Sequence, residues 1–236
     1  MFKWDFRRGF AELLVIFLGV TLGLLADDWR QQRERESDAH EALGLILEDL
    51  ANDSAELASL RPPLARHTTW TAWLQPQWEV ESPGPDPDSL GLALRSYLFA
   101  NSPQLQASAY SSLKDGDRVG LIVDPELRAL VIRYYEDSHI RLMQYFEGHQ
   151  AERLKLMDAL YPHVLMPPGR DPGSVWPIVA GPMSVTSSWG RLQQDNLVYN
   201  HATTVGIMAD LAVRFIDEAQ ERNLVLRGAI EAALAN

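Results

Sequence analysis

The chain opens with an apolar block that constrains it more than any other feature. Residues 10–26 read FAELLVIFLGVTLGLLA, and the polar run DDWRQQRERE follows at once. An apolar stretch this close to an N-terminus is typical of a membrane anchor or of a secretory signal. The sequence therefore predicts a chain that begins in a membrane and holds its remaining residues beside it.

The block is short for a membrane span, but its flanks favour one. A helix of this length covers about 25 Å, against about 30 Å of hydrocarbon. The membrane-boundary anchors that make up the difference are two interfacial tryptophans and two arginines with long side chains: Trp4, Trp29, Arg7 and Arg8.

A cleaved signal peptide is the alternative interpretation. Leu24-Leu25-Ala26, however, puts a large residue three positions before the cut, where a small one is preferred. We therefore expect an uncleaved anchor over residues 1–30, with the span at about 10–26 in contact with the lipid bilayer.

Charge around the block favours a cytoplasmic N-terminus. Lysine and arginine are balanced on the two sides, but the amino group adds a positive charge before the block and the acidic residues gather after it. Residues 31–236 are then expected to form an extracytoplasmic domain. The chain has no cysteine, which fits either compartment.

The acidic balance of the chain bears on its partners. The formal net charge is −11 and the isoelectric point is near 5.0. Such a domain repels phosphate backbones, so no nucleic-acid partner is expected. Anionic lipid headgroups would repel it too, which favours a domain that stands off the membrane surface.

The part after the block reads as helices separated by proline-rich breaks. Aliphatic residues recur at helical spacing over 37–60, with no breaker between this segment and the block, so anchor and first helix are expected to form one rod. Arg61-Pro62-Pro63 should end that helix. A second helix is expected over 64–81, kinked or divided at Pro76. The remaining helices are expected over 89–101, over 102–113 from a Ser102-Pro103 start, over 124–161 from Asp124-Pro125, and from Ser187 or Ser188 almost to the C-terminus.

Two connections complete this prediction. A turn follows residue 113, with a short extended piece at 119–123, and residues 162–182 form a loop with nine Pro or Gly. Long helices with short connections favour an antiparallel bundle. The expected fold is all-α, with an N-terminal transmembrane helix (1–30) followed by an antiparallel helical bundle (31–236).

Several short motifs resemble one protein family. Glu12-Leu13-Leu14-Val15-Ile16, Leu18-Gly19-Val20 and Asp27-Asp28-Trp29 are similar to the N-terminus of a family of uncharacterised bacterial single-span membrane proteins. The stretches 109–113 and 121–127, and Ser188-Trp189, also resemble that family. The resemblance implies a bacterial inner-membrane anchor plus a helical domain of unknown function, and it supplies no catalytic residues.

The search for chemistry is mostly negative. Loops typical of nucleotide binding and the common hydrolase motifs are absent, so no catalytic, cofactor-binding or metal residues and no cofactor are expected. Glu136 and His139 have the spacing of one half of a di-iron site, but the second half is missing, which favours ordinary polar residues. His201 lies near the apolar stripe of the last helix, where a hydrogen-bonded core histidine is expected.

Tryptophans cluster in the second predicted helix. Trp70, Trp73 and Trp78 could line a ligand groove, although core anchors are the more common role. The Pro/Gly loop over 162–182 could be a lid or simply a bundle connection.

One face of the predicted span carries an unusual combination. Glu12, Ile16, Gly19 and Gly23 share a helix face, and Gly19 and Gly23 form GxxxG, a close-packing motif of membrane helices. Pairing of Glu12 with Arg8 would leave the glycines incidental, whereas an interface would use the face for a homo-oligomer or for another membrane protein.

These observations predict a membrane-anchored, non-enzymatic interaction, scaffold or sensor-like module. The alternative is a ligand-binding protein or enzyme with a site between the Trp70/Trp73/Trp78 segment and the 162–182 loop. A deep pocket with polar lining would favour the alternative, and a packed bundle would favour the scaffold.

Overall fold

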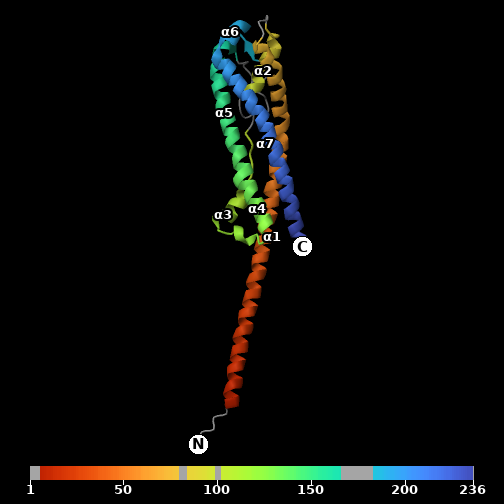
Figure 1. Ribbon diagram of the computed structural model, residues 1–236, viewed down its shortest axis with the longest axis vertical. Helices are drawn as coiled ribbons and strands as arrows, with labels where there is room; N and C mark the ends of the chain where they lie inside the picture. The colour runs from red at the N-terminus through yellow and green to blue at the C-terminus, as the bar shows by residue number, and fades with distance from the viewer. Residues whose placement is uncertain (1–5, 80–83, 99–101, 166–182, 236) are drawn as a thin grey trace.

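Helices make up most of the described part of the molecule. The computed structural model describes residues 6–79, 84–98, 102–165 and 183–235, with the backbone alone for residues 6–15. Figure 1 shows a helical bundle and, below it, a single helix that continues towards the N-terminus. The all-α prediction is therefore confirmed for these residues. The helices are α1 (Phe6–Leu74), α2 (Pro87–Leu98), α3 (Ser108–Asp115), α4 (Pro125–Arg133), α5 (Ile140–Leu160), α6 (Trp189–Gln194) and α7 (Asn196–Leu234).

Short elements connect these helices. Two 3-10 turns, η1 (Gln75–Glu79) and η4 (Tyr161–His163), follow α1 and α5, and the π-helical turn η3 (Tyr134–His139) joins α4 to α5. The strands β1 (Val164–Leu165) and β2 (Ser184–Val185) pair antiparallel, with Val164 opposite Val185. This pairing closes the base of the predicted Pro/Gly loop, whose residues 166–182 lie outside the described part of the chain.

The first helix passes through the predicted break at Pro62 and Pro63. Both prolines lie inside α1, so the prediction that they end the helix was wrong. Leu60 and Leu64, on either side of them, are buried in the bundle, while Pro62 is exposed and Pro63 is half-buried. Burial of the flanking leucines offsets the loss of helical hydrogen bonds, and residues 58 and 59, whose carbonyls lose their helical donors, are exposed. Pro76 does end the helix, which stops at Leu74.

The capping signals at two later helices are confirmed. Asp124 precedes Pro125 and its carboxylate accepts hydrogen bonds from the backbone N–H groups of Glu126 and Leu127. Ser188 caps α6 in the same way, and a second cap at Asp195 then starts α7, so the predicted last helix is interrupted once. Both caps use neighbouring residues, which is why the sequence reveals them.

The predicted helix over 102–113 was wrong in its first half. Residues 102–107, here called the strap, form no regular element, and α3 begins only at Ser108. Carboxylates of α1 hold the backbone N–H groups of this region instead: Glu56 accepts from Gln104 at 3.0 Å, Asp53 from Gln106 at 2.6 Å and Asp49 from Ala109 at 2.9 Å. The predicted extended piece at 119–123 is likewise a 3-10 turn, η2 (Val119–Leu121), for most of its length.

The bundle has an up–down–up–down course. In Figure 1, α1 ascends, α2 descends from the far end, α4 and α5 ascend, and α7 descends beside both ascending helices. The strap continues the descent of α2 to α3 at the base of the bundle. The predicted antiparallel bundle is therefore built with one descending element that is half helix and half strap.

The core lies in three layers along the bundle axis. The layer far from the N-terminus joins the end of α1 to α2, α6 and the start of α7, around Trp78, Tyr97 and Trp189. The middle layer packs α1 leucines on α5 and α7. The basal layer joins α1 to α3, α4 and the end of α7, around Ile46, Tyr134 and Leu226.

Helices α1 and α7 approach closely beside Gly206. A β-carbon built on this residue would lie 2.3 Å from Cγ2 of Thr71, a side chain that is itself buried. Glycine is therefore the residue that lets the two long helices pack at this distance.

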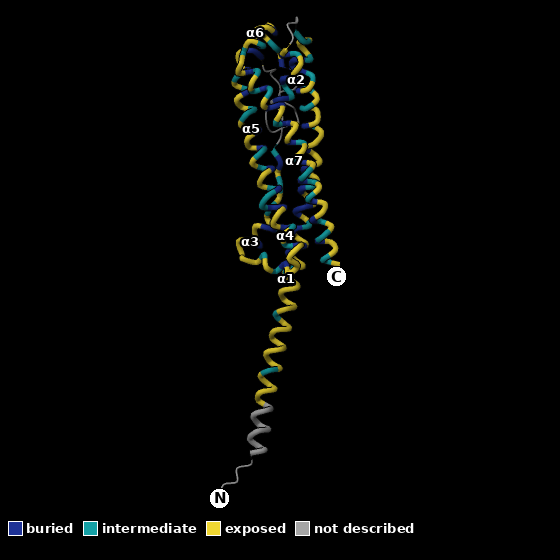
Figure 2. Tube along the Cα trace, in the orientation of Figure 1, coloured by how far each residue is buried: buried dark blue, intermediate teal, exposed yellow. Residues whose placement is uncertain are grey.

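Below the bundle, α1 is exposed to solvent along its described side chains. Residues 6–37, here called the stalk, emerge from the base, and Figure 2 colours almost all of the described residues from 16 to 37 as exposed. Across the described side chains, no helix combines the length and the apolar character needed to cross a membrane. The first six residues of the predicted 10–26 span have side chains outside that description.

Substitution of Gly206 tests the close approach of α1 and α7. Gly206→Ala should lower the free energy of unfolding by about 1–3 kcal/mol, because the new methyl group meets Thr71. The matched control is Gly228→Ala on the same helix, where nothing lies within 4 Å of the added carbon. Chemical denaturation should show that the control is neutral or more stable, as alanine is the better helix former; equal destabilisation by both would contradict this packing.

Asp53 gives the domain a specific pH dependence. Burial raises the pKa of its carboxyl to about 6. Hydrogen bonds from the Gln106 backbone and the Tyr134 hydroxyl lower this pKa, whereas the nearby carboxylates of Asp49 and Glu56 raise it further. The folded state therefore binds this proton more tightly than the unfolded state, and the associated stability is lost as pH rises through about 6.

The pair of wild type and Asp53→Asn isolates this effect. Between about pH 7.5 and about pH 5, the wild type should gain about 1 kcal/mol of unfolding free energy relative to the variant. Denaturant titrations of both proteins at both pH values measure this difference. A difference that does not change with pH would show that Asp53 is not protonated in this range.

Candidate functional site

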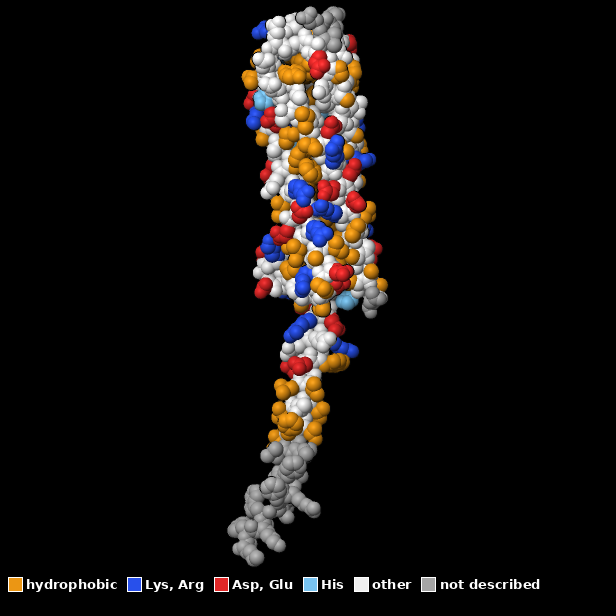
Figure 3. Space-filling model, in the orientation of Figure 1, with side chains coloured by type: hydrophobic (Ala, Val, Ile, Leu, Met, Phe, Trp, Pro, Cys, Tyr) orange, Lys and Arg blue, Asp and Glu red, His pale blue; other side chains and the backbone are white. Residues whose placement is uncertain are grey.

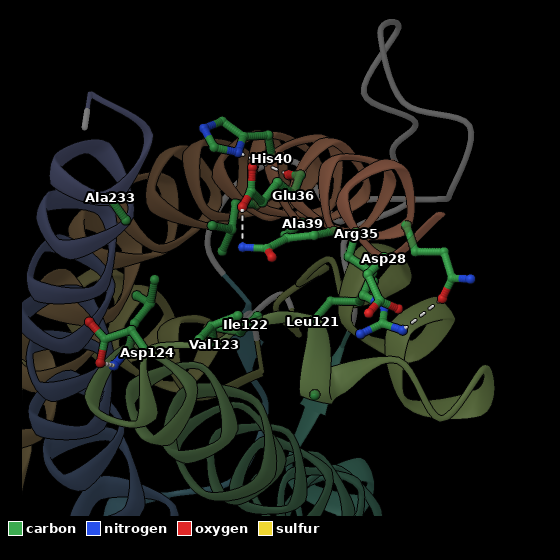
Figure 4. Close-up of a pocket in the computed structure, with 15 residues that line it drawn as sticks. Asp28, Arg35, Glu36, Ala39, His40, Leu121, Ile122, Val123, Asp124 and Ala233 are labelled. Atoms are coloured by element: carbon green, nitrogen blue, oxygen red, sulfur yellow. Dashed lines mark hydrogen bonds between the residues drawn. The ribbon is translucent and has the colours of Figure 1, made fainter. Parts of the chain in front are cut away.

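A groove opens at the base of the bundle, where α1 leaves it. Its volume is about 660 Å³, within the range of small-ligand sites. Figure 4 shows α1 along one side and the loop 120–124, with the starts of α4 and the end of α7, along the other. We call this the basal groove.

The end of the basal groove nearer the N-terminus is polar. The α1 residues that line it are Asp28, Gln31, Gln32, Arg35 and Glu36. Their hydrogen bonds run along the helix: Gln32 donates to Glu36 at 3.2 Å and Arg35 donates to Gln31 at 3.4 Å. Such exposed contacts are weak, so these side chains can turn towards a ligand.

The other end of the groove is apolar. Leu43, Ile122 and Leu127 form its floor and belong to the basal core layer, each less than a tenth exposed. Ala233 lies at the edge, and Val123 stands beside the floor with 84% of its surface exposed. Asp124 lines the same end, but its carboxylate is held by the cap of α4.

Local contacts fix the loop that forms the second wall. Asp117 has a positive φ of 52°, and Arg118 then donates its backbone N–H to Leu113 O at 2.8 Å. The Arg118 guanidinium reaches across to Asp38 of α1 at 3.3 Å. These contacts hold the loop 120–124 opposite α1 and keep the groove open between them.

The predicted interface residues lie on the stalk, away from the groove. Ile16 is 67% exposed, and a β-carbon on Gly19 or Gly23 would meet nothing within 4 Å. The Glu12 side chain lies outside the described residues. At 100° per residue, the Gly19/Gly23 face is on roughly the opposite side of α1 from Arg35 and Ala39 in the groove.

The predicted boundary anchors are only partly described. Trp29 is 60% exposed and the Arg33 guanidinium lies 4.2 Å from its ring centroid. Trp4 lies outside the described residues, and so do the side chains of Arg7 and Arg8.

The three tryptophans lie in or against the far core layer. Trp78 is buried and its ring centroid lies 4.9 Å from that of Trp189, while Trp70 and Trp73 meet edge to face at 5.6 Å and pack on this layer. This is the core role that was favoured from the sequence. The alternative site beside the 162–182 loop depends on residues 166–182, which lie outside the description.

Glu136, the carboxylate of the incomplete di-iron spacing, is engaged elsewhere. Glu136 accepts hydrogen bonds from the Tyr110 hydroxyl at 2.9 Å and from Lys114 Nζ at 2.6 Å, which together lower the pKa of its carboxyl. No group of three or more potential metal ligands occurs in the described part of the chain. His201 is half-buried and hydrogen-bonded to Glu152 at 2.5 Å, close to the predicted role.

Some of the buried polar residues were not predicted from the sequence, among them two histidines and an aspartate. His67 and His149 lie in the core with ring centroids 6.0 Å apart, and burial lowers the pKa values to about 3 and about 4. They are therefore neutral at physiological pH. Asp53 is the aspartate, and the only sequence signal for its burial is its position on the inner face of α1.

Comparisons with known proteins add no assignment. No family model, curated protein or solved structure matches the chain. The resemblance of the N-terminal motifs to a bacterial membrane family stays a prediction.

Proposed function

We propose that the protein is a membrane-tethered, non-enzymatic binding module, in which the N-terminal part of α1 is a single-pass anchor and the bundle presents the basal groove. One observation carries this proposal. The stalk exposes large apolar side chains on all sides, each at least 49% exposed: Ile16, Phe17, Leu18, Val20, Leu22, Leu24 and Leu25.

An apolar surface of this kind requires a cover. Helices that are apolar all round are normally buried in protein or lipid, whereas the bundle leaves these side chains bare. In Figure 3 hydrophobic side chains cover the visible face of the stalk just above its grey end, and charged residues resume above them. A bilayer covers such a ring of side chains evenly, which supports a span over 10–26.

The position of the tether supports the rest of the proposal. The bundle is acidic overall, α1 is unbroken from the stalk into the bundle, and acidic residues follow the block. These features favour a bundle on the extracytoplasmic side of a bacterial inner membrane, with the N-terminus in the cytoplasm. The Gly19/Gly23 face then lies in the bilayer, available to a second copy or to another membrane protein.

Anchoring is tested by extraction from membranes. The full chain should sediment with membranes through an alkaline carbonate wash, because the apolar block over residues 10–26 is inserted. A variant without residues 1–30 should be recovered in the soluble fraction with a helical circular dichroism spectrum, since the three core layers begin beyond residue 41. Release of the full chain by carbonate, or an N-terminus that begins after residue 20, would refute the anchor.

The glycine face is tested by substitution within the span. Gly19→Ile or Gly23→Ile should weaken self-association or partner recovery in a membrane two-hybrid assay, because a branched side chain prevents close helix approach. Leu18→Ile and Leu22→Ile, on other faces, are the matched controls and should have no effect. Unchanged association in Gly19→Ile would mean that the span is only a tether.

A further inference from the structure

We propose that His67 and His149, here called the histidine joint, make the bundle sensitive to acid, so that mild acid opens the half far from the N-terminus while the base stays closed. Such a joint would regulate the binding module whether or not α1 is anchored in a membrane.

The histidine joint lies where two layers of the core meet. On α1, His67 follows Leu64 of the middle layer and precedes Leu74 of the far layer. On α5, His149 follows Phe146 of the middle layer, and the centroids of the two imidazole rings are 6.0 Å apart. The apolar clusters of the middle and far layers are therefore separated at this level by a pair of polar rings.

Both rings are buried without compensating hydrogen bonds. His67 is 1% exposed and His149 is 0% exposed, and none of their four ring nitrogens makes a hydrogen bond of good geometry with the described residues. A neutral imidazole can occupy such a site, whereas an imidazolium would lose its hydration for little in return. Protonation of either ring therefore favours a structure in which water reaches it.

The groups that face the joint add to this effect. Burial is the main cause of the lowered pKa values of both rings, and the nearby cation of Arg153 on α5 lowers them further. Tyr97 of α2 meets the His67 ring edge to face at 5.1 Å and is neutral, because burial raises the pKa of its hydroxyl to about 12. The Val205 carbonyl of α7 favours protonated His149, but by less than burial disfavours it.

No carboxylate in the described part of the chain acts on either ring. Glu152, which precedes Arg153 on α5, is engaged with other partners: it is hydrogen-bonded to His201 of α7 at 2.5 Å and accepts from Lys155 at 3.0 Å. The described surroundings of the joint therefore offer no counter-ion to a protonated ring.

The direction of the pH dependence follows from the two pKa values. His67 and His149 titrate at about 3 and about 4 in the closed bundle, against 6.5 in an open one, so the closed far half loses stability as pH falls below 6.5. Between about pH 7.5 and about pH 5, each histidine should raise the ratio of open to closed bundle by about 30-fold. Asp53 acts in the opposite direction nearer the base, because the pKa of its carboxyl is raised in the folded state.

Hydrogen–deuterium exchange of the full chain in mild detergent tests the joint. Protection factors, corrected for the intrinsic pH dependence of exchange, are measured at about pH 7.5 and about pH 5. Protection in α2, in α6 and at residues 68–74 should fall by about 30-fold or more in acid. Protection at residues 46–50 and 226–230, in the basal layer, should not fall.

Matched variants remove the titration. In His67→Leu/His149→Leu, side chains of similar volume stay neutral, so the far half should keep its protection in acid. His67→Gln/His149→Gln cannot titrate either and serves the same purpose if the leucine pair does not fold. His40→Leu, at an exposed position of the same helix α1, controls for the loss of a histidine and should respond to acid as the wild type does.

Three outcomes would overturn the proposal. One is unchanged protection of the wild-type far half in acid, and another is an equal loss in the wild type and in a folded double variant. The third is a loss shared equally by the base, because that pattern indicates unfolding of the whole domain rather than opening at the joint. The regional pattern in the wild type decides this last point without any variant.

Discussion

Three carboxylates on α1 determine how the bundle is completed. Asp49, Asp53 and Glu56 accept backbone N–H groups from the strap and from the start of α3, so a segment without helical hydrogen bonds still satisfies its polar groups. Hydrogen bonds to charged acceptors contribute about 1.5–3 kcal/mol each, enough to replace a helix here. The strap in turn sets α3 at the base, and the loop that follows α3 forms one wall of the basal groove. The groove therefore depends on an acidic stripe that lies outside it.

The sequence predicted the features that depend on neighbouring residues and missed those that depend on residues far apart in the chain. The caps at Asp124 and Ser188 depend on residues two or three positions away, and both were found. Ser102-Pro103 carries a similar local signal, but the N–H groups that follow it bond to carboxylates about fifty residues earlier, which no local pattern reveals. The prediction that Pro62 and Pro63 end the helix was wrong for a related reason, because burial of the leucines on both sides outweighs the helix-breaking tendency of proline. The groove could not be predicted, since its walls come from α1, the loop 120–124 and the end of α7.

The unbroken course of α1 links the proposed anchor to the groove mechanically. Its two prolines lie inside the bundle, where packing against α5 and α7 holds both sides, and the stalk below contains no proline. A helix without a break keeps the groove at a fixed height and rotation relative to the apolar block. The Arg118–Asp38 ion pair adds a contact between α1 and the loop at the point where the helix leaves the bundle. A ligand at the base would thus meet a preformed site, which lowers the conformational cost of binding.

The two proposed functional faces of α1 are arranged so that neither blocks the other. The Gly19/Gly23 face lies roughly opposite the groove, and above the apolar block it continues through Glu34, Glu41 and Glu48, all exposed. A second copy packed in parallel on the glycines would bring identical carboxylates together along this line, which is unfavourable. Self-association would therefore be confined to the glycines, with the helices splayed above them, whereas a partner with a basic segment could follow α1 upward. In either arrangement the groove remains open on the far side of the helix.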